Sequence, residues 1–183
     1  GPLSVLAMAR PGTPYRGFNT IVSAFERIKA ERPDVTLRLF GDARLARRDI
    51  PFAFDDLGLI TDQQRLAHAY ACADIFVDGS DFQGFGLCGL EAMACGAACV
   101  LTNAGGVNEY ASHGVNALLV DPADPEALAA GALALLSDPA RRADLAEAGT
   151  RTARAFCVRR EVSETLAFFE ALAGDSRPAE AAP

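Results

Sequence analysis

The sequence has no tryptophan and only two histidines, and no apolar run in it comes near the roughly eighteen residues that a membrane-spanning helix needs. The missing run excludes a transmembrane segment. The histidines, His68 and His113, belong to no cluster with ligand spacing, so the sequence predicts no metal site. It also contains no CxxC pair, no GxxxxGK[ST] phosphate loop and no evident Ser–His–Asp set.

Positive charge is scarce as well. Against 24 Asp and Glu residues stand 17 Lys and Arg, which gives a net charge of −7. This balance argues against a general binder of nucleic acid or of anionic membranes. Any anionic ligand must therefore be held by a few well-placed cations and by backbone dipoles.

The cysteines are odd in number and sit mostly among Ala, Leu and Val. They are Cys72, Cys88, Cys95, Cys99 and Cys157. We expect buried free thiols in a reducing compartment, with neither a disulfide framework nor a metal site.

With 183 residues, half of them apolar, the chain is long enough for one domain with a substantial core. We expect that domain over residues 1–173 and a flexible tail over residues 174–183. Gly1 and Pro2 resemble the remnant of an expression tag, so residues 1–3 are expected to be partly tag-derived. Because strand-like residues follow at once, we expect a domain cut from a longer protein.

Apolar periodicity predicts strands and helices in alternation. Strands are predicted at 3–9, 35–40, 52–57, 74–77, 97–101 and 117–120, and helices at 18–28, 62–72, 87–96, 107–112 and across 125–173, with Thr61 or Asp62 capping the second helix. This order predicts a doubly wound parallel α/β sheet with extra C-terminal helices. Ligands of such sheets bind beyond the carboxyl ends of the strands, where the strand order switches.

The glycine-rich stretch from Asp81 to Gly96 is the main candidate site. Gly84 and Gly86 allow backbone N–H groups to approach a ligand, and a helix beginning behind them favours an anion. Glu91, about one helical turn further on, can reach a sugar hydroxyl. The helix face expected to pack on the sheet consists of Leu87, Leu90 and Ala94.

Two further loops are predicted at the same edge of the sheet. Arg10 and Arg16 flank a Pro/Gly loop after the first strand and can clamp a diphosphate. The Gly105–Gly106 turn can offer N–H groups to an anion, although an ordinary turn is equally compatible with the sequence. Tyr70 is expected to be a core residue. The arginines that follow the second strand, Arg44, Arg47 and Arg48, are expected to be solvated.

The segment "DFQGFGLCGLEAMACGAACVLTNAGGVNEY" resembles the core of family 4 glycosyltransferases, which are retaining enzymes of the GT-B fold. That family carries an E-x7-E motif within a pattern that Ser80, Gly84–Leu87, Leu90–Ala94 and the Gly105–Gly106 pair match. The resemblance implies a Rossmann-like fold and identifies the chain as the C-terminal, donor-binding half of such an enzyme.

The resemblance also implies a role for each matching residue. Glu91 is expected to bind the ribose hydroxyls, and the two arginines, Arg10 and Arg16, the phosphates. The glycine-rich loop is expected to contact the diphosphate or the sugar. The loop after Gly41 and the Leu57–Ile60 region are expected to surround the base. The expected nucleotide and sugar contacts are Gly41, Leu57, Ile60, Gly84, Phe85, Gly86, Leu87, Gly105 and Gly106.

Position 83 departs from the family pattern. Gln83 stands where the first glutamate of the motif normally faces the donor sugar, and an amide cannot carry negative charge. Either the sugar is recognised differently, with Gln83 among the catalytic residues, or this member transfers poorly or not at all.

The implied reaction is glycosyl transfer with retention, from a nucleotide-activated sugar such as a UDP- or GDP-sugar. No cofactor or metal is expected to be required. A glycan or lipid-linked acceptor is expected to bind an N-terminal domain that this chain lacks, so the isolated domain is expected to be inactive. We expect no nucleic-acid partner and a cytoplasmic location. Association of the full-length protein with the inner face of the membrane is compatible with this interpretation.

Two alternatives stay open. The first is a degenerate, non-catalytic domain that binds a sugar nucleotide or another protein, which the residue at position 83 makes credible. The second is a nucleotide-sugar epimerase of the same two-domain fold. It fits less well, because its active-site histidine and acids have no clear counterpart in the sequence.

Overall fold

The computed structural model describes residues 1–45 and 50–175. Two of the arginines expected to be solvated, Arg47 and Arg48, lie outside the described residues. The chain divides into two compact units, Gly1–Ala153 and a second that begins at Arg154, whereas the sequence led us to expect one domain over 1–173. Each unit is described on its own.

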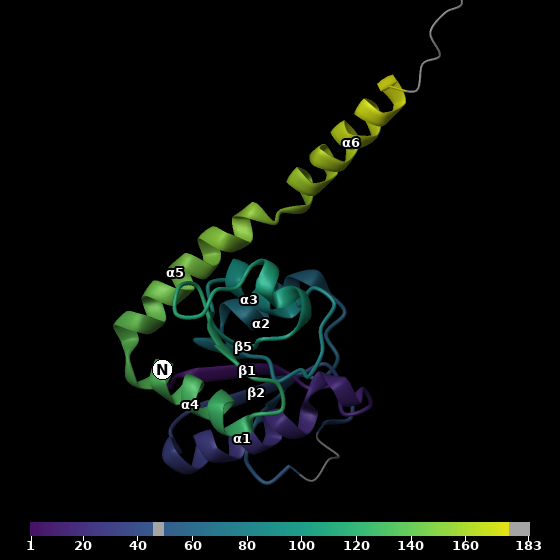
Figure 1. Ribbon diagram of the computed structural model, residues 1–183. Coiled ribbons are helices and arrows are strands. Elements are labelled where there is room, and N and C mark those ends of the chain that lie inside the picture. The colour runs from purple at the N-terminus through teal and green to yellow at the C-terminus, as the bar shows by residue number, and fades with distance from the viewer. Residues whose placement is uncertain (46–49, 176–183) are drawn as a thin grey trace, which may run out of the picture. The chain divides into compact units, whose positions relative to one another are not determined.

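Strands and helices alternate through the first unit (Figure 1). The strands are β1 (Ser4–Met8), β2 (Thr36–Phe40), β3 (Asp55–Asp56), β4 (Ile75–Val77), β5 (Ala98–Thr102) and β6 (Leu118–Val120). The α-helices are α1 (Phe18–Glu31), α2 (Gln63–Ala71), α3 (Leu87–Ala94), α4 (Pro125–Ser137) and α5 (Pro139–Ala155), and two 3-10 helices are η1 (Pro14–Arg16) and η3 (Gly105–Glu109).

The strands form one sheet in the order β3-β2-β1-β4-β5-β6, and all five pairings are parallel. The chain winds from β1 outward to β3, then returns beside β1 with β4 and winds the other way. The predicted fold class, a doubly wound parallel α/β sheet, is therefore confirmed. The strand order switches between β1 and β4, and a ligand crevice is expected beyond the carboxyl ends of these two strands.

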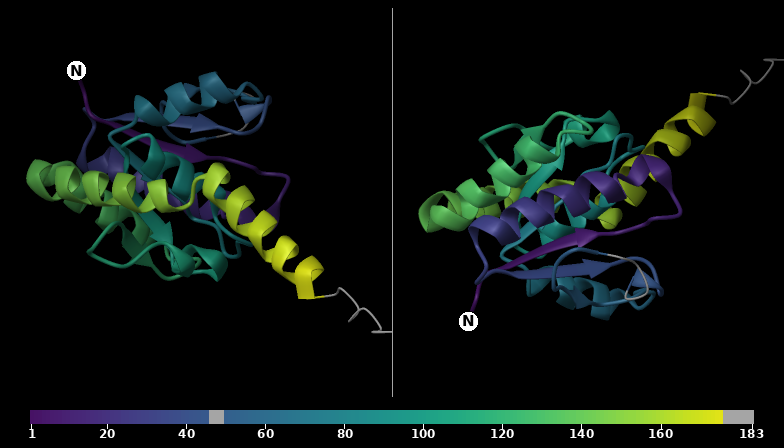
Figure 2. Two further views of the ribbon diagram at one scale, coloured as in Figure 1. Left: turned by 90° about the horizontal axis from the view of Figure 1, so that it is seen from above. Right: turned by 90° about the horizontal axis from the view of Figure 1, so that it is seen from below.

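Helices cover both faces of the sheet, so the side chains on both faces of the central strands are buried. On β1, Val5 and Ala7 join the core under α1 and α4, whereas Leu6 and Met8 join the core under α2 and α3. In Figure 1 the two layers of helices lie on opposite sides of the strands, and Figure 2 shows α1 in front of the sheet when the molecule is seen from below. The buried strands need the near-continuous apolar runs that the sequence shows.

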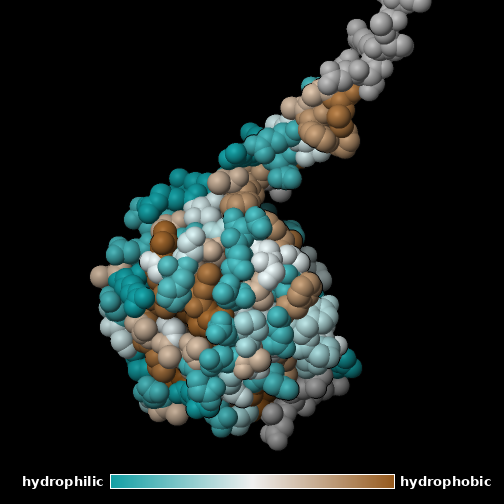
Figure 3. Space-filling model, viewed as in Figure 1, coloured by the Kyte–Doolittle hydropathy of each residue, from teal (hydrophilic) through white to brown (hydrophobic). Residues whose placement is uncertain are grey.

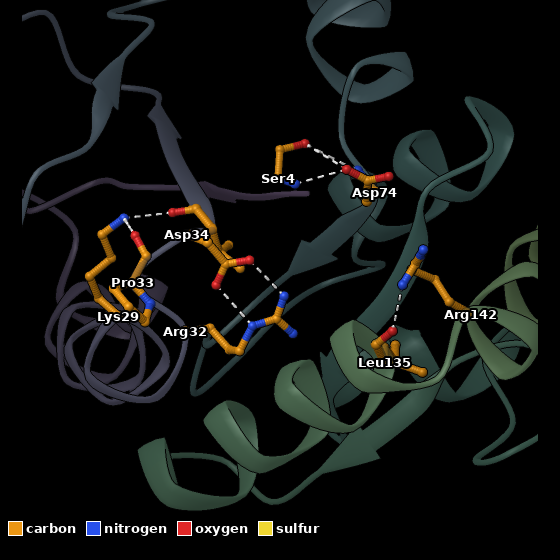
Figure 4. Close-up of polar contacts among 9 residues, drawn as sticks. Ser4, Lys29, Arg32, Pro33, Asp34, Asp74, Leu135 and Arg142 are labelled. Atoms are coloured by element: carbon orange, nitrogen blue, oxygen red, sulfur yellow. Dashed lines mark hydrogen bonds and ion pairs between the residues drawn. The ribbon is translucent and has the colours of Figure 1, made fainter. Parts of the chain in front are cut away.

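Side-chain contacts at the other end of the sheet join neighbouring elements (Figure 4). The Ser4 N–H and hydroxyl both donate to Oδ2 of Asp74, at 2.8 and 3.2 Å, which ties the start of β1 to the residue before β4. Arg142 on α5 donates to the Leu135 carbonyl on α4 at 2.8 Å. The first contact sets the strand pair at which the site forms.

Two predicted elements differ from those observed. The third strand, expected over 52–57, is reduced to Asp55–Asp56 because Phe52 and Phe54 turn inward as loop residues, and the Phe52 ring lies 6.0 Å from that of Phe25. The helix expected over 107–112 forms as the shorter 3-10 helix η3. Asp62 is the N-cap of α2, with its side chain accepting from the Arg65 N–H at 2.8 Å.

The prediction for the buried face of α3 was wrong in part. Leu87 is 60% exposed and Ala94 is exposed, and of the three expected residues only Leu90 is buried. The helix packs instead through Gly89, Leu90, Ala92 and Met93. Leu87 is the first residue of the helix and faces the crevice described below.

The prediction of buried thiols was also wrong for most of the cysteines. All five are free, but only Cys99 is fully buried; Cys88 and Cys95 are half-buried, and Cys72 and Cys157 are exposed. Alanine-rich surroundings in sequence do not distinguish the buried from the exposed face of a helix.

The second unit contains α6 (Val158–Asp175). Figure 3 shows a brown, apolar patch on its surface. Its exposed large apolar side chains are Val162, Leu166, Phe168, Phe169 and Leu172. In the described part of the chain, α6 and every other helix fall short of the length and apolar character that crossing a membrane requires.

Asn116 is a buried polar junction between the loop after η3 and α5. Its Oδ1 accepts from the Ser112 N–H at 2.7 Å, and its Nδ2 donates to the Tyr110 carbonyl and to Thr152 Oγ1, each at 2.8 Å. The side chain is 6% exposed, so water cannot replace these partners readily.

We expect Asn116→Ala to lower the free energy of unfolding by about 2–3 kcal/mol, because it removes three hydrogen bonds, one of them to the buried Tyr110 residue. Asn108→Ala is the matched control: Asn108 is exposed, and its loss should cost no more than about 0.5 kcal/mol. Urea unfolding followed by circular dichroism measures both, and equal costs for the two variants would contradict the junction role.

Candidate functional site

A cavity of about 400 Å³ opens at the carboxyl edge of the sheet, where the strand order switches. Its walls come from the loops after β1, β2 and β4 and from helices α2 and α3. The lining residues are Met8, Arg10, Arg16, Phe40, Gly41, Leu59, Ile60, Leu66, Tyr70, Gly84, Phe85, Gly86, Leu87, Cys88 and Glu91. Nine of the thirteen residues expected from sequence to form the site are among them.

The glycine-rich loop ends in the N-terminus of α3. Gly86 is the N-cap residue, with a left-handed φ of 84°, no side-chain cap and no acidic residue in the first turn. The first N–H groups of a helix have no intrahelical partner, and here the cavity lies in front of them. The helix start therefore presents partial positive charge to the cavity, which favours a negatively charged group such as a phosphate.

Hydrogen bonds from behind fix this loop in place. The Tyr110 hydroxyl donates to the Gly86 carbonyl at 2.6 Å, and the Gly106 N–H donates to the Gly84 carbonyl at 2.9 Å. The Gly106 N–H is therefore already used within the protein. Neither glycine of the Gly105–Gly106 turn lines the cavity, so in this structure the turn supports the loop.

Glu91 is held by a buried tyrosine. The Tyr70 hydroxyl donates to Glu91 Oε2 at 3.1 Å, and the Tyr70 ring packs edge-to-face against Phe40 and Phe76 with centroids 5.7 and 5.5 Å apart. Burial raises the pKa of Tyr70, which keeps the hydroxyl protonated as a donor. One carboxylate oxygen is thus fixed, and the carboxylate lines the cavity.

Both arginines expected from the sequence line the cavity. Arg10 follows β1, and Arg16 ends η1, where its guanidinium lies 5.8 Å from the centre of the Tyr15 ring. Their main chains hydrogen-bond within the loop, but among the described residues neither guanidinium group forms a hydrogen bond or an ion pair with a protein group. Their charges are available to an anion placed between the loops after β1 and β4.

The opposite wall is largely apolar. Phe40 is the last residue of β2 and Gly41 follows it. Leu59 and Ile60 come from the loop before α2, and Leu66 comes from α2 itself. Such a wall accommodates an uncharged ring. Leu57, which we expected here, lies instead in the lining of an adjacent hollow together with Asp56 and His68.

Gln83 does not line the cavity. Its side chain is 2% exposed and sits beneath the loop, with Oε1 unpartnered. A turn of the loop places Gly84 and Phe85 in the lining and turns Gln83 inward.

Sequence reasoning missed several lining residues, among them Met8, Phe40, Leu66 and Cys88. Tyr70 was expected only in the core, yet it contributes to both the core and the site. The Cys88 thiol lies 3.6 Å from the Met8 sulfur, and burial raises its pKa to about 11, so it is a protonated wall residue and no nucleophile at neutral pH. For Met8, the available sequence signal was its position at the end of the first strand, two residues before Arg10.

In the described part of the chain, no group of three or more His, Cys, Asp or Glu side chains could hold a metal ion. The charged groups at the cavity are two arginines and one carboxylate. The cavity thus brings two cations, a helix N-terminus and a carboxylate together on a doubly wound α/β domain, and these groups can bind an anion and a hydroxyl group.

Comparison with protein families agrees with this class. The model of the family "Glycosyl transferases group 1" matches residues 2–138, most of the chain. The chain belongs to that family, and the resemblance noted from its sequence is confirmed.

Curated relatives are glycosyltransferases. D-inositol 3-phosphate glycosyltransferase of Salinispora tropica is 35% identical over 197 residues, which span 88% of this chain and 40% of the relative. A GDP-mannose-dependent monoacylated alpha-(1-6)-phosphatidylinositol monomannoside mannosyltransferase of Corynebacterium glutamicum is 32% identical, over 74% of this chain and 39% of the relative. The chain thus spans at most two fifths of the length of these relatives.

Solved structures share the fold. Sucrose-phosphate synthase of Thermosynechococcus elongatus matches 95% of this chain and 46% of its own, with a TM-score of 0.81 and 26% identity. Anabaena HepE, solved in complex with UDP-glucose, matches 89% of this chain and 48% of its own, with a TM-score of 0.74 and 25% identity.

We expect Gly105→Ala to destabilise the domain strongly. The residue has a φ of 58°, and a Cβ would lie 1.9 Å from the Gln83 carbonyl oxygen, so the loop must move. Gly114→Ala is the matched control, with a φ of 73° and nothing within 4 Å. We expect a cost of about 1–2 kcal/mol for Gly114→Ala and at least about 3 kcal/mol for Gly105→Ala in urea unfolding; similar costs would contradict the close packing of turn and loop.

Proposed function

We propose that this chain is the donor-binding domain of a retaining glycosyltransferase and binds a nucleotide-activated sugar such as a UDP- or GDP-sugar. The observation that carries the proposal is the cavity at the β1–β4 switch. It combines two unpaired arginines and an uncapped helix start with a carboxylate that Tyr70 holds in place. The relatives' names and the UDP-glucose complex of Anabaena HepE support it.

The arrangement suits each part of such a ligand. The diphosphate lies against Arg10, Arg16 and the N–H groups at the start of α3. Glu91 accepts hydrogen bonds from the ribose hydroxyls, and the apolar wall that includes Phe40 and Ile60 accommodates the base. The sugar then lies beside Gly84 and Phe85, at the open end of the loop.

The chemical task is to stabilise the leaving nucleoside diphosphate as negative charge grows on it. Fixed cations and amide dipoles do this without reorganisation, and they act most strongly in a site from which water is excluded. Arg10, Arg16 and the α3 N-terminus supply such groups, so no metal is required. Gln83 would act beneath the loop, through its position, and not by a negative charge.

The rest of the proposal concerns the full-length protein. A glycan or lipid-linked acceptor binds a further, N-terminal domain, so the chain alone transfers little sugar. The enzyme works in the cytoplasm, and the full-length protein can associate with the inner face of the membrane.

A second candidate is a non-catalytic domain that binds a sugar nucleotide. The observation in its favour is Gln83, an amide in place of the glutamate of the motif, with its side chain buried. Donor turnover by the full-length protein separates the two candidates, because binding without turnover is expected only of the second.

We expect the chain to bind UDP or GDP in calorimetry, and Glu91→Ala to weaken that binding at least tenfold through the loss of charged hydrogen bonds to the ribose. The 2′,3′-dideoxy nucleotide should bind the wild type and Glu91→Ala with similar affinity, since it offers no hydroxyls. Glu109→Ala, an exposed acid outside the cavity lining, serves as the control. Equal losses for both nucleotides would contradict the ribose role, and no binding of UDP or GDP to the wild type at millimolar concentration would sink the proposed function.

The two arginines predict a dependence on phosphate charge and on salt. Arg16→Gln should weaken binding of the nucleoside diphosphate by about tenfold or more and that of the free nucleoside hardly at all, because only the former has a charge to pair. The salt dependence of diphosphate binding should also become shallower. Arg44→Gln, at an exposed arginine that pairs with Asp42, should leave both unchanged. A loss shared equally by nucleoside and diphosphate would rule out phosphate contact.

A further inference from the structure

Two buried polar side chains at the base of the glycine-rich loop each have one oxygen without a hydrogen-bond donor. Asp78, directly after β4, is 4% exposed, and Gln83 is 2% exposed. Oδ1 of Asp78 accepts from the Ser80 N–H at 2.8 Å, but Oδ2 of Asp78 and Oε1 of Gln83 have no partner. A buried acceptor without a donor costs about 1–3 kcal/mol, so this pair of acceptors calls for a donor.

The surroundings of Asp78 favour its neutral form. The groups that act on it or feel its charge are Arg16 from η1, Cys88 from α3, Cys99 from β5 and Tyr110 after η3. Of these only Arg16 is cationic, and it also lines the cavity.

Burial is the largest influence on Asp78 and raises its pKa. Hydrogen bonding to Ser80, the Arg16 charge and weaker hydrogen bonding to the Gln83 amide lower this pKa, but they offset the rise only in part. A charged Asp78 in turn contributes to the raised pKa of Tyr110.

We propose that Asp78 is protonated and forms with Gln83 a neutral acid–amide pair that holds the Gly84–Gly86 loop in its ligand-binding form. The Gln83 side chain lies within hydrogen-bonding reach of Asp78. A proton on Oδ2 turns one of the two orphan acceptors into a donor, and Oε1 of Gln83 accepts from it when the amide is turned with its oxygen toward the acid. One proton thereby satisfies both groups.

The pair accounts for the amide at position 83. A glutamate there would place a second carboxyl group beside the buried one of Asp78, and two such groups cannot both ionise cheaply. In this chain the single buried carboxyl group of the pair is that of Asp78, and the Gln83 amide is its neutral hydrogen-bond partner.

The pair is placed to act on the ligand-binding loop. The Gln83 carbonyl packs against Gly105, and the next carbonyl, of Gly84, accepts from Gly106. In this arrangement Asp78, which follows β4, holds the side chain of Gln83, and the Gly105–Gly106 turn packs against its main chain. Asp78 is a positioning residue, because its effect on a ligand passes through the loop. The role in ligand binding rests on the proposed function; the protonation and pairing do not.

The first test compares the pH dependence of thermal stability in the wild type and in Asp78→Asn. A carboxyl group whose pKa is raised by folding stabilises the protein below its ordinary pKa, and that contribution is lost as pH rises through the raised value. The wild-type melting temperature should thus fall with rising pH relative to that of Asp78→Asn. Asp81→Asn, at an exposed acid in the same loop, should follow the wild type.

Infrared spectroscopy reports on the proton directly. The wild type at neutral pH should show the carbonyl stretch of a protonated carboxylic acid, which the Asp78→Asn spectrum lacks. A wild type without this band would show that Asp78 is ionised and overturn the proposal.

The second test is a double-mutant cycle of Asp78→Asn with Gln83→Glu. Gln83→Glu alone should lower the melting temperature and weaken UDP or GDP binding at least tenfold at neutral pH. The double variant again holds one carboxyl and one amide, and should recover to within about threefold of Asp78→Asn in binding. A double variant as impaired as Gln83→Glu would contradict the pairing. If the wild type binds no nucleotide, the proposed function fails, while the melting temperatures and the infrared band still decide the inference.

Discussion

The parallel pairing of β1 with β4 is the constraint on which the site depends. These strands are separated by most of the first half of the chain, yet Val5, Leu6 and Ala7 pair directly with Ile75, Phe76 and Val77. The pairing reverses the strand order, so the loops after the two strands diverge and leave a crevice that no crossover helix fills. The loop with Arg10 and the loop with Gly84 face each other for this reason. Ser4 and Asp74 fix the same strand pair at its other end, at 2.8 Å.

Within the crevice, the groups that face a ligand and the groups that hold them in position come from different elements. The α3 N-terminus needs free N–H groups, so its loop cannot be stabilised by a side-chain cap, and Gly86 has none. Stabilisation comes instead from behind, from the Tyr110 hydroxyl and the Gly106 N–H. Glu91 follows the same rule, since Tyr70 holds it from α2 while the rest of the carboxylate stays available. The loop and the acid are thus rigid before any ligand arrives, which lowers the entropy cost of binding.

How far the sequence predicts this site follows from the range of each interaction. Strand and helix periodicity is local, so the sheet class and the helix start behind Gly86 could be predicted. Glu91 and both arginines were candidates from their places near the predicted strand ends, and the family pattern assigned each of them an expected role. The Tyr70–Glu91 contact joins α2 to α3 across the core, and nothing local in either segment indicates it. The inward turn of Gln83 is likewise tertiary, because it depends on the Gly105 backbone packing against the loop. Leu87 was assigned to the wrong face for a related reason: the first helical residue borders the crevice, and helical spacing alone does not show where a crevice begins.

Charge explains why a neutral pair beneath the loop matters. The chain carries a net charge of −7, and its anion-binding end depends on two arginines and one helix dipole. An ionised carboxylate buried directly under that loop would oppose a diphosphate through a medium that screens poorly, and it would also compete for Arg16. With its proton retained, Asp78 adds a hydrogen bond without adding charge, and Arg16 stays available to the ligand. An ordinary acidic surface can therefore coexist with an anion site, provided that the acids nearest the site either bind the ribose, as we propose for Glu91, or are kept neutral, as we propose for Asp78.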